Sequence, residues 1–273
     1  MTKIDIIKKA NTENRNTLTE AEAKELLKQY GIPVVKEKVV KTIEEAEKIA
    51  EKIGYPVVVK GLGAKLTHKT EKGLVKLNLK HKEEVRNAAS YIMEVAGNDL
   101  EGILVQPMLE GKREFVAGLF HDEQFGPTVM FGLGGIFTEA IGDVVFRLAP
   151  IDEVEARKMI DELHAQKLLG AFRGENAPDK DSLIKTLVGL SRIGLAIPEI
   201  KEIDINPLLV SPDGKVTAVD ALIVLGKTAE KKKPPLPVDP RNIAKLFYPK
   251  SVPFVGASAN IRKWGHLMFS NVA

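Results

Sequence analysis

Cysteine is absent from all 273 residues of this chain. Its absence excludes disulfide bonds, thiolate zinc sites and a cysteine nucleophile, and it fits a protein of the cytoplasm. Long apolar runs are also missing, since no stretch approaches the roughly 20 residues that a membrane-spanning helix needs. The polar N-terminus lacks the apolar core of a signal peptide. We therefore expect a cytoplasmic protein with no membrane partner.

The chain has no large excess of charge of either sign. It carries 40 lysines and arginines against 37 aspartates and glutamates, for a net charge of +3, and the two signs alternate along the sequence. A nucleic-acid-binding surface gathers basic residues on one face, so nucleic acid is not an expected partner. A small positive excess suits a phosphate-rich small ligand.

Several common catalytic motifs are missing. The sequence contains neither the G-x-x-x-x-G-K-[ST] phosphate loop nor the G-x-S-x-G nucleophile elbow. No metal-ligand spacing relates the five histidines, at positions 68, 81, 121, 164 and 266. Glutamates such as Glu22, Glu25 and Glu44 to Glu47 are interpreted as solvated helix faces.

Amphipathic helices and short apolar strands alternate irregularly along most of the chain. The spacing of apolar residues predicts helices over 19–30, 43–53, 82–96, 152–163 and 180–193. Strands are predicted over 34–40, 56–60, 74–79, 103–108, 114–120, 128–131, 144–148, 200–210 and 216–224. This order lacks the regular alternation of a doubly wound sheet. It predicts an α+β fold, with helices on largely antiparallel sheets.

The composition changes near the C-terminus. The segment KKKPPLP, residues 231–237, is typical of a stiff, charged linker. We expect an N-terminal tail over 1–17, one large domain over 18–226, a linker over 227–240 and a further segment over 241–273.

Two basic side chains flank a glycine-bearing segment after the apolar strand 56–60. Lys60 ends that strand, where a lysine can reach a phosphate as a point charge. His68 lies in the polar loop 65–73 with lysines on both sides, and neutral imidazole can attack phosphorus near pH 7. A lysine that leaves the core and a solvated loop histidine would give the same pattern, so both interpretations stay open.

Oxygen donors occur at two places further along the chain. The connector over 105–114 can present an adenine edge with hydrogen-bond partners, and Glu114 can bind ribose hydroxyls, although an ordinary connector has a similar composition. Asn206 and Asp220 lie on the two strands of the predicted 200–224 hairpin, where oxygen ligands can hold Mg²⁺ if phosphates supply the rest. Asp220 stands in an apolar strand and needs a partner, a metal or water.

Four ordered blocks of this sequence resemble the ATP-grasp domain of NDP-forming acyl-CoA synthetases. The blocks, all within residues 18–225, are EAKELLKQYGIPV, PVVVKGLGAKLTHKTEKGLVKLNL, ILVQPMLEGKREFVAGLFHDEQFGPTVMFGLGGIFTEAIGDVVFRLAP and EIDINPLLVSPDGKVTAVDALI. The resemblance implies an ATP-grasp fold, in which two α+β subdomains grip a nucleotide. By this resemblance, 18–55 and 131–226 form one lobe and 56–130 mainly the other.

The resemblance also implies roles for single residues. Lys60 contacts the phosphates of ATP or ADP, and His68 relays a phosphoryl group. Asn206 and Asp220 hold Mg²⁺. The remaining nucleotide contacts are the adenine hinge Gln106, Pro107, Met108 and Leu109, then Glu114 at the ribose or nearby phosphates, and Arg147. One departure from the family pattern is Thr70, where serine is commoner.

The reaction implied by the resemblance is acyl-CoA + ADP + phosphate ⇌ carboxylate + CoA + ATP, the reaction of an acid–thiol ligase of the acetate–CoA ligase type. The CoA-side histidine and the acyl pocket are not found in this sequence, so full activity is expected to need an α-type CoA-binding subunit or a homologous chain. Residues 242–258 resemble the opening of the CoA-binding domain, with its first strand and glycine turn over 252–258. We expect 241–273 to be an incomplete, loosely ordered extension that does not bind CoA alone.

Two alternatives remain at this point. The chain is also compatible with a succinyl-CoA synthetase β-like subunit or another ATP-grasp ligase, although the histidine-bearing loop favours the acyl-CoA family. A non-catalytic remnant that binds nucleotide or a partner subunit is the other alternative.

Overall fold

The computed structural model describes residues 3–66, 69, 71–135, 142–226, 239–251, 255–256, 258–261 and 263–270. The chain divides into two compact units, Met1–Ala229 and Glu230–Ala273. In the first unit the helices are α1 (Lys3–Thr12), α2 (Glu20–Gln29), α3 (Ile43–Ile53), α4 (Lys82–Ala96), η1 (Gly97–Asp99), α6 (Glu153–Glu162), η2 (Gln166–Leu169) and α7 (Lys180–Ala196). Its strands are β1 (Lys38–Val40), β2 (Val57–Leu62), β3 (Val75–Leu79), β4 (Gly102–Pro107), β5 (Arg113–Asp122), β6 (Gly126–Leu133), β7 (Val144–Leu148), β8 (Ile200–Val210), β9 (Val216–Ala218) and β10 (Leu222–Leu225).

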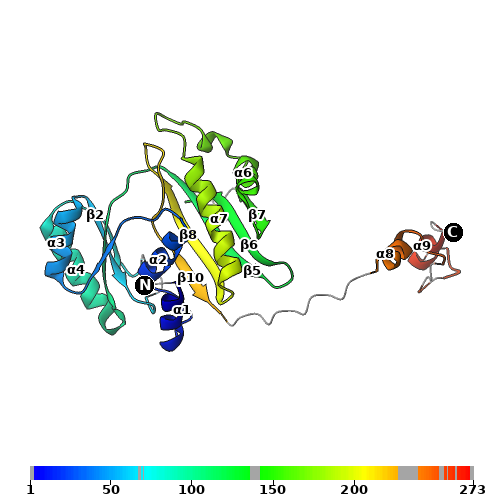
Figure 1. The fold of residues 1–273 in the computed structure, drawn as a ribbon, viewed down its shortest axis with the longest axis horizontal. Helices are drawn as coiled ribbons and strands as arrows, with labels where there is room; N and C mark the ends of the chain where they lie inside the picture. Colours follow the sequence, from blue (N-terminus) through cyan, green and yellow to red (C-terminus); the bar gives the residue numbers. More distant parts are fainter. Residues whose placement is uncertain are drawn as a thin grey trace. The chain divides into compact units, whose positions relative to one another are not determined.

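A four-stranded antiparallel sheet, in the order β1-β4-β2-β3, forms the smaller lobe with α3 and α4 (Figure 1). Val57, Val59 and Val105 pack against the two helices in one hydrophobic cluster. Because side chains alternate between the faces of a strand, the residues next to these valines point to the opposite face. Lys60 and Gln106 are therefore on the face that is turned away from α3 and α4.

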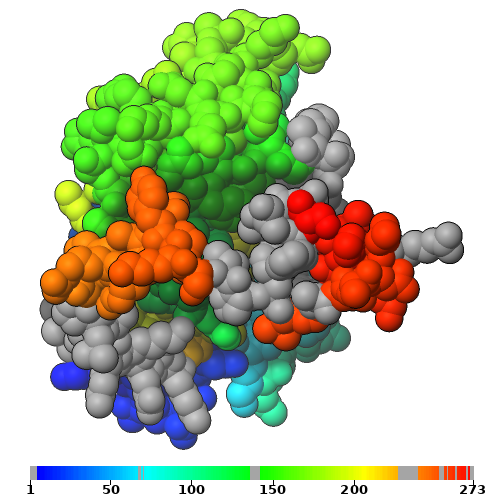
Figure 2. Space-filling view, turned by 90° about the vertical axis from the view of Figure 1, so that its right-hand side faces the viewer, coloured from blue at the N-terminus to red at the C-terminus, as the bar shows by residue number. Residues whose placement is uncertain are grey.

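The larger lobe is a six-stranded antiparallel sheet in the order β10-β8-β5-β6-β7, with β9 paired to β8. Helices α6 and α7 pack beside it (Figure 1). Figure 2 shows surface of this lobe, in green, towards the top, and surface of α1, α2 and the smaller lobe, in blue and cyan, towards the bottom.

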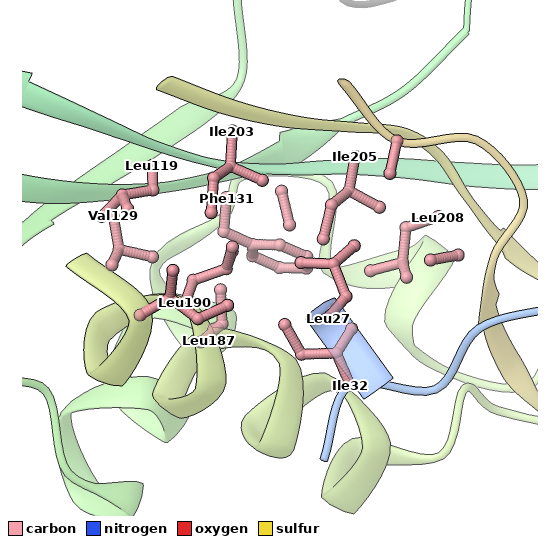
Figure 3. Close-up of a cluster of buried hydrophobic side chains, with 14 of the residues drawn as sticks. Leu27, Ile32, Leu119, Val129, Phe131, Leu187, Leu190, Ile203, Ile205 and Leu208 are labelled. Carbon is pink, nitrogen blue, oxygen red and sulfur yellow. The ribbon is translucent and has the colours of Figure 1, made fainter. Parts of the chain in front are cut away.

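Phe131 lies at the centre of the main hydrophobic cluster, between the larger sheet and α7 (Figure 3). Its ring stacks on Phe115 with 5.5 Å between the centroids. Leu187 and Leu190 reach it from the helix, and Leu27 reaches it from α2. Truncating a buried phenylalanine to alanine typically costs about 3–5 kcal/mol, so this cluster holds α2 and α7 against the sheet that carries part of the site.

The first seventeen residues do not form the tail that the sequence predicted. Lys3–Thr12 form α1, and Ile6, Ile7 and Ala10 are buried in the main cluster. These residues form a helix instead of a tail because Ile7 and Ala10 follow Ile6 by one and four positions, which places all three on one face of a helix. Most other residues of 1–17 are polar, so the three apolar positions were not interpreted as a helix.

The predicted lobe boundaries also need correction. Residues 38–53, which were assigned to the lobe of 131–226, supply β1 and α3 of the four-stranded lobe. Strands β5 and β6, at 113–133, belong to the six-stranded sheet instead of the smaller lobe. Sheet membership depends on hydrogen bonds between strands far apart in the sequence, and no local pattern reveals them.

The second unit contains α8 (Pro240–Phe247) and α9 (Trp264–Ser270). Val255 and Gly256 form a turn, whereas most of the strand expected over 252–258 lies outside the described residues. Among the described residues, no helix is long and apolar enough to span a membrane.

Candidate functional site

A cavity of about 420 Å³ opens where the start of α2, the end of β2 and the strands β8 and β10 converge. Both lobes contribute to its walls. The residues that line it are Thr17, Leu18, Thr19, Glu20, Gly63, Ala64, Leu66, Lys69, Asp204, Asn206, Asp220, Ala221 and Leu222. Most of the polar ones carry oxygen, and one is a lysine.

Lys60 links the two lobes beside this cavity. Its Nζ donates to Glu20 Oε1 at 2.6 Å and to Asp220 Oδ2 at 3.2 Å, and the side chain is only 4% exposed. Burial disfavours the charged amine, but the two carboxylates outweigh it and raise the pKa of Lys60 above its ordinary value. The ammonium is therefore fixed in its charged form at the edge of the cavity.

Glu20 is the centre of a buried ion network that the sequence did not predict. Its carboxylate accepts from Lys60, from Lys24 Nζ at 2.8 Å and from Lys69. Burial opposes the ionisation of Glu20, yet the three lysines hold its pKa well below the ordinary range. Lys24 continues the network, because its Nζ also donates to Glu37 at 2.6 Å and to Gln106 Oε1 at 3.1 Å.

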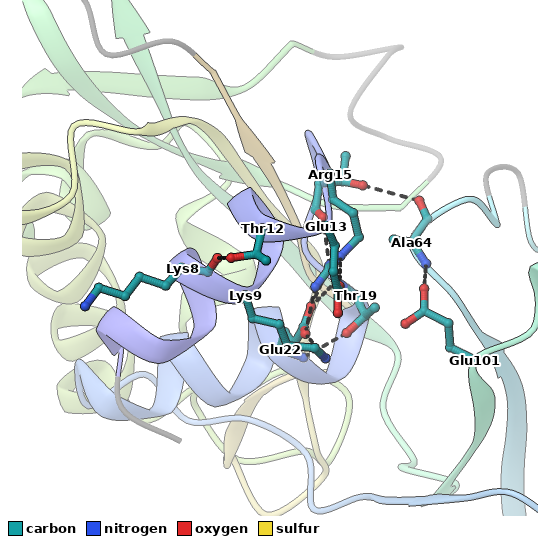
Figure 4. A network of polar contacts seen from close by, with 10 residues as sticks. Lys8, Lys9, Thr12, Glu13, Arg15, Thr19, Glu22, Ala64 and Glu101 are labelled. Atoms are coloured by element: carbon teal, nitrogen blue, oxygen red, sulfur yellow. Dashed lines mark hydrogen bonds and ion pairs between the residues drawn. The ribbon is translucent and has the colours of Figure 1, made fainter.

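The network depends on a firmly capped helix. Thr19 caps α2 by accepting from the Glu22 backbone, and the Glu22 side chain accepts from the Thr19 backbone in return. Arg15 and Lys9 both donate to Glu22 (Figure 4). Glu22 is therefore buried and paired, and the interpretation of it as a solvated helix face is wrong.

Glu47 requires the same correction. It is 3% exposed and pairs with Arg86 of α4. Helical periodicity identifies an outward face but cannot show that another helix covers it.

Asp220 interrupts the second strand of the predicted hairpin. The sequence predicted one strand over 216–224, whereas the structure has β9 and β10 with Asp220 between them. Its own Oδ1 accepts from the Ala221 backbone, while Oδ2 faces Lys60. The break lies opposite Asn206 and Pro207 of β8, between the residues of β8 that pair with β10 and those that pair with β9, and Pro207 has no N–H to donate to the ladder.

Asn206 and Asp220 line the same cavity, as does Asp204. Burial raises the pKa of Asp204, and the nearby Glu202 and Asp220 raise it further, so negative charge accumulates at this wall. Amide and carboxylate oxygens are the donors that Mg²⁺ prefers, and one or two suffice where phosphates complete the shell. Among the described residues, no group of three or more histidines, cysteines, aspartates or glutamates forms a metal site by itself. The donor set fits a magnesium ion that arrives with a phosphate ligand.

The glycine-bearing loop after β2 is tied to both lobes. The Ala64 backbone N–H donates to Glu101 at 2.7 Å, and its carbonyl accepts from Thr17 Oγ1 at 3.3 Å (Figure 4). Gly63 is required here, because an added Cβ would lie 2.2 Å from the Asp99 carbonyl oxygen. These contacts hold the loop as a wall of the cavity.

The expected adenine hinge, Gln106 to Leu109, runs from the end of β4 into the connector to β5. The Gln106 side chain is buried and accepts from Lys24, and the Met108 backbone N–H donates to the Pro56 carbonyl. The Gln106 amide therefore belongs to the ion network beside Lys60. The role of the hinge in binding adenine stays a prediction.

Glu114 lines a second cavity, of about 640 Å³, at the start of β5. Leu133, Gly134 and Phe172 contribute to the same cavity. Gly134 lies so close to β5 that an added Cβ would lie 2.9 Å from backbone atoms of Glu114 and Phe115. Glu114 therefore lines a different cavity from Asn206 and Asp220, which Lys60 contacts through Asp220. The contact of Glu114 with ribose stays a prediction.

Arg147 is not among the described residues that line either cavity. It lies on β7, an edge strand of the larger sheet, and its guanidinium pairs with Glu155 and Glu162 of α6. The structure does not bring it together with Lys60, and its contact with nucleotide stays a prediction.

His68, together with Thr67 and Thr70, lies outside the described residues. Its neighbour Lys69 lines the first cavity.

The fold and this cavity define a two-lobed protein with a cationic and oxygen-rich site between its sheets. The ATP-grasp domain family matches residues 9–225. The chain therefore belongs to the ATP-grasp family.

The chain is similar to the β subunit of ADP-forming acetate–CoA ligase I from Pyrococcus furiosus, with 47% identity over 226 residues, which cover 81% of this chain and 97% of the relative. It also resembles solved structures of Ca. Korarchaeum cryptofilum dinucleotide-forming acetyl-coenzyme A synthetase 1. The complex with coenzyme A and Ca-AMPCP has 43% identity and a TM-score of 0.77 over 82% of this chain and 100% of that chain. The complex with coenzyme A and Mg-AMPPCP, in which the phosphohistidine segment points towards the nucleotide site, has 42% identity and a TM-score of 0.73 over the same shares. Within the ATP-grasp family, the chain resembles the β-type part of ADP-forming acyl-CoA synthetases.

Proposed function

We propose that this chain is the ATP-grasp subunit of an ADP-forming acyl-CoA synthetase. It binds ATP or ADP with Mg²⁺ and relays a phosphoryl group through His68. The observation that carries the proposal is the contact of Lys60 with Asp220 at a cavity that Asn206 also lines, in a chain that is 47% identical to an acetate–CoA ligase β subunit.

Lys60 supplies the positive charge for the nucleotide phosphates. Its ammonium is already charged and positioned by Glu20 and Asp220, so little reorganisation is needed when an anion arrives. Gly63 and Ala64 form the neighbouring wall. In this proposal Gln106 to Leu109 bind the adenine, and Glu114 contacts the ribose.

Asn206 and Asp220 are the residues that would hold the metal. A magnesium ion there would neutralise phosphate charge during the transfer. The chain itself orients the two oxygen donors by placing them on β8 and in the break between β9 and β10.

His68 is the proposed carrier of the phosphoryl group. A ring nitrogen attacks the γ-phosphorus of ATP, the bond from that phosphorus to the bridging oxygen breaks, and ADP leaves while the displaced ring proton passes to solvent. The reverse sequence makes ATP from ADP. Acyl-phosphate and CoA chemistry is assigned to an α-type partner or a homologous chain, in the cytoplasm, since the relative from Pyrococcus furiosus is a β subunit.

The test is labelling with ATP that carries a radioactive γ-phosphate, in the presence of Mg²⁺. We expect an acid-labile, base-stable label on the wild-type chain and none on His68→Ala. His81→Ala is a matched control, because His81 precedes α4 without a side-chain capping bond and is not among the described residues that line the cavity.

The outcomes separate the alternatives. If His68→Ala keeps all the label, the relay role of His68 is wrong. If the wild-type chain binds nucleotide by calorimetry but takes up no label, the chain is a nucleotide-binding remnant. For a chain that takes up label, activity with a candidate CoA-binding subunit and either acetate or succinate distinguishes the two acyl substrates.

A further inference from the structure

Lys24 of α2 is a buried lysine whose three partners come from three different segments of the chain. Its Nζ donates to Glu20 Oε1 at 2.8 Å, to Glu37 Oε2 at 2.6 Å and to Gln106 Oε1 at 3.1 Å. An ammonium group has three N–H donors and no acceptor, so these three bonds use all of its donors. Lys24 is 2% exposed, which leaves almost no access for water to replace a lost partner.

The bond from Lys24 to Gln106 joins the two lobes. Helix α2 packs on the larger sheet through Leu27 (Figure 3), whereas Gln106 lies near the end of β4 in the smaller sheet. Because a lysine can only donate, the atom of the Gln106 amide that faces it is the oxygen, and this fixes the orientation of the amide. Gln106 is 1% exposed, so water does not take the place of Lys24.

Two other contacts hold the proposed adenine hinge, Gln106 to Leu109, and both stay within the smaller lobe. Gln106 pairs with Val58 of β2 in the strand ladder, and the Met108 N–H donates to the Pro56 carbonyl at 2.9 Å. These contacts set the shape of the hinge but not its place relative to α2. The bond from Lys24 supplies that further constraint.

One carboxylate oxygen connects this bond to the phosphate end of the proposed site. Glu20 Oε1 accepts from Lys24 at 2.8 Å and from Lys60 at 2.6 Å. Three hydrogen bonds in a row therefore link the hinge to the proposed phosphate-binding lysine. Neither Lys24 nor Gln106 is among the described residues that line the cavity. Lys24 can thus act on a ligand through its partners and not by contact.

We propose that Lys24 is a positioning residue, which holds the adenine hinge at a fixed distance from Lys60 and does not touch the nucleotide. The inference rests on the proposed function, because it requires adenine at 106–109 and phosphate at Lys60. A nucleotide that must reach both ends binds best when their spacing is already set, since less ordering is needed on binding. Inorganic pyrophosphate occupies the phosphate end alone and is insensitive to that spacing.

The test compares the binding of Mg·ADP and Mg·pyrophosphate by calorimetry. In Lys24→Met the affinity for ADP should fall by about tenfold, the scale of one charge-assisted hydrogen bond, while the affinity for pyrophosphate stays at the wild-type value. Lys28→Met is the matched control, because Lys28 is an exposed lysine one turn further along α2. Equal losses for both ligands would assign Lys24 to the phosphate end or to the fold in general. That result overturns the inference, as does the absence of any loss.

A second variant isolates the hinge contact, because Lys24→Met also removes the partner of Glu37. Gln106→Leu leaves Lys24 with both of its carboxylates and should show the loss for ADP alone. If Lys24→Met does not fold, Gln106→Leu decides the question by the same comparison of ligands. The double variant should bind ADP no more weakly than Lys24→Met, since both changes break one contact. Losses that multiply in the double variant mean that the two residues act independently, which contradicts the inference.

Failure of the proposed function gives a different result. A wild-type chain that binds neither ligand contradicts the proposed function and, with it, this inference. A wild-type chain that binds ADP more tightly than pyrophosphate, with the same preference in Lys24→Met, contradicts the inference alone.

Discussion

Lys60 and Asp220, 160 residues apart in the sequence, are joined by a hydrogen bond of 3.2 Å between Nζ and Oδ2. Lys60 comes from the four-stranded lobe and Asp220 from the edge of the six-stranded lobe. This single contact brings the proposed phosphate-binding and metal-binding groups to the same place. The proposed function depends on it.

The first prediction concerns Lys60. Replacement with methionine should weaken binding of Mg·ADP by about tenfold or more, because one charge-assisted contact with phosphate is lost. Isothermal titration calorimetry measures the affinity. Lys80→Met is the control, since Lys80 is an exposed lysine after β3 of the same lobe. Equal affinity in Lys60→Met and wild type would remove Lys60 from the nucleotide site.

Asp220 is expected to set the magnesium requirement. Asp220→Asn should raise the Mg²⁺ concentration needed for half-maximal ADP binding by about tenfold, as expected when one charged ligand is lost. The measurement is a magnesium titration at fixed ADP. Glu202→Gln, which removes a nearby exposed carboxylate of β8, should leave the requirement unchanged. If the required Mg²⁺ concentration rises equally in Asp220→Asn and Glu202→Gln, the effect comes from the lost negative charge in general and not from coordination of the ion by Asp220.

Glu114 can be tested with a modified nucleotide. If its carboxylate accepts from a ribose hydroxyl, wild-type protein should prefer ADP over 2′-deoxy-ADP by about tenfold, and Glu114→Gln should lose most of that preference. Competition binding with the two nucleotides gives the ratio. Glu110→Gln, an exposed glutamate of the same connector, should keep the preference. A ratio unaffected by Glu114→Gln contradicts the ribose contact.

The stability of the α1–α2 region should depend on pH through Glu22. Burial opposes its ionisation, but Arg15, Lys9 and the Thr19 backbone lower the pKa of Glu22 to about 2. Because the folded-state pKa is depressed, the contribution to stability is present above the unfolded pKa and is lost as the pH falls towards 2. Glu22 is buried, but its partners Lys9 and Arg15 are partly exposed to water, so we expect about 1 kcal/mol after allowance for solvent screening.

Urea denaturation at pH 6, 4 and 3 measures this contribution. Glu22→Gln should be about 1 kcal/mol less stable than wild type at pH 6, and the gap should narrow as the pH falls. Glu44→Gln, an exposed glutamate at the start of α3, should match wild type throughout. A gap that stays constant with pH would assign the effect to the lost helix cap and not to the charge.

The sequence predicted the local elements well wherever one face of an element is buried against one neighbour. Helices α3 and α4 and strand β7 begin and end where the spacing of apolar residues predicted. The predictions of one strand over 216–224 and of a tail over 1–17 failed, because both depend on contacts with distant elements. The break at Asp220 lies opposite Asn206 and Pro207 of β8, a pairing between segments that are far apart in the local pattern. Helix α1 is held by a core that its own short sequence does not contain.

The candidate site was predicted in part. Lys60, Asn206 and Asp220 were expected together by resemblance; Asn206 and Asp220 line one cavity and Lys60 contacts Asp220, while their binding roles stay predictions. The roles of Glu20, Lys24 and Lys69 were missed, because a glutamate at the start of a helix has the same sequence signature whether it is solvated or buried. A signal was available in the N-cap residue Thr19, which marks Glu20 as the first residue of α2.

By itself, the sequence determined the α+β class, most element boundaries, the family and the residue types suited to phosphate and magnesium. Those properties follow from short-range periodicity and from residue chemistry, both of which a linear chain carries in full. Only the tertiary structure decided which strands share a sheet, and that one buried carboxylate joins three lysines. Such contacts arise from long-range packing, because the burial that makes a charge need a partner exists only after the two lobes have folded together.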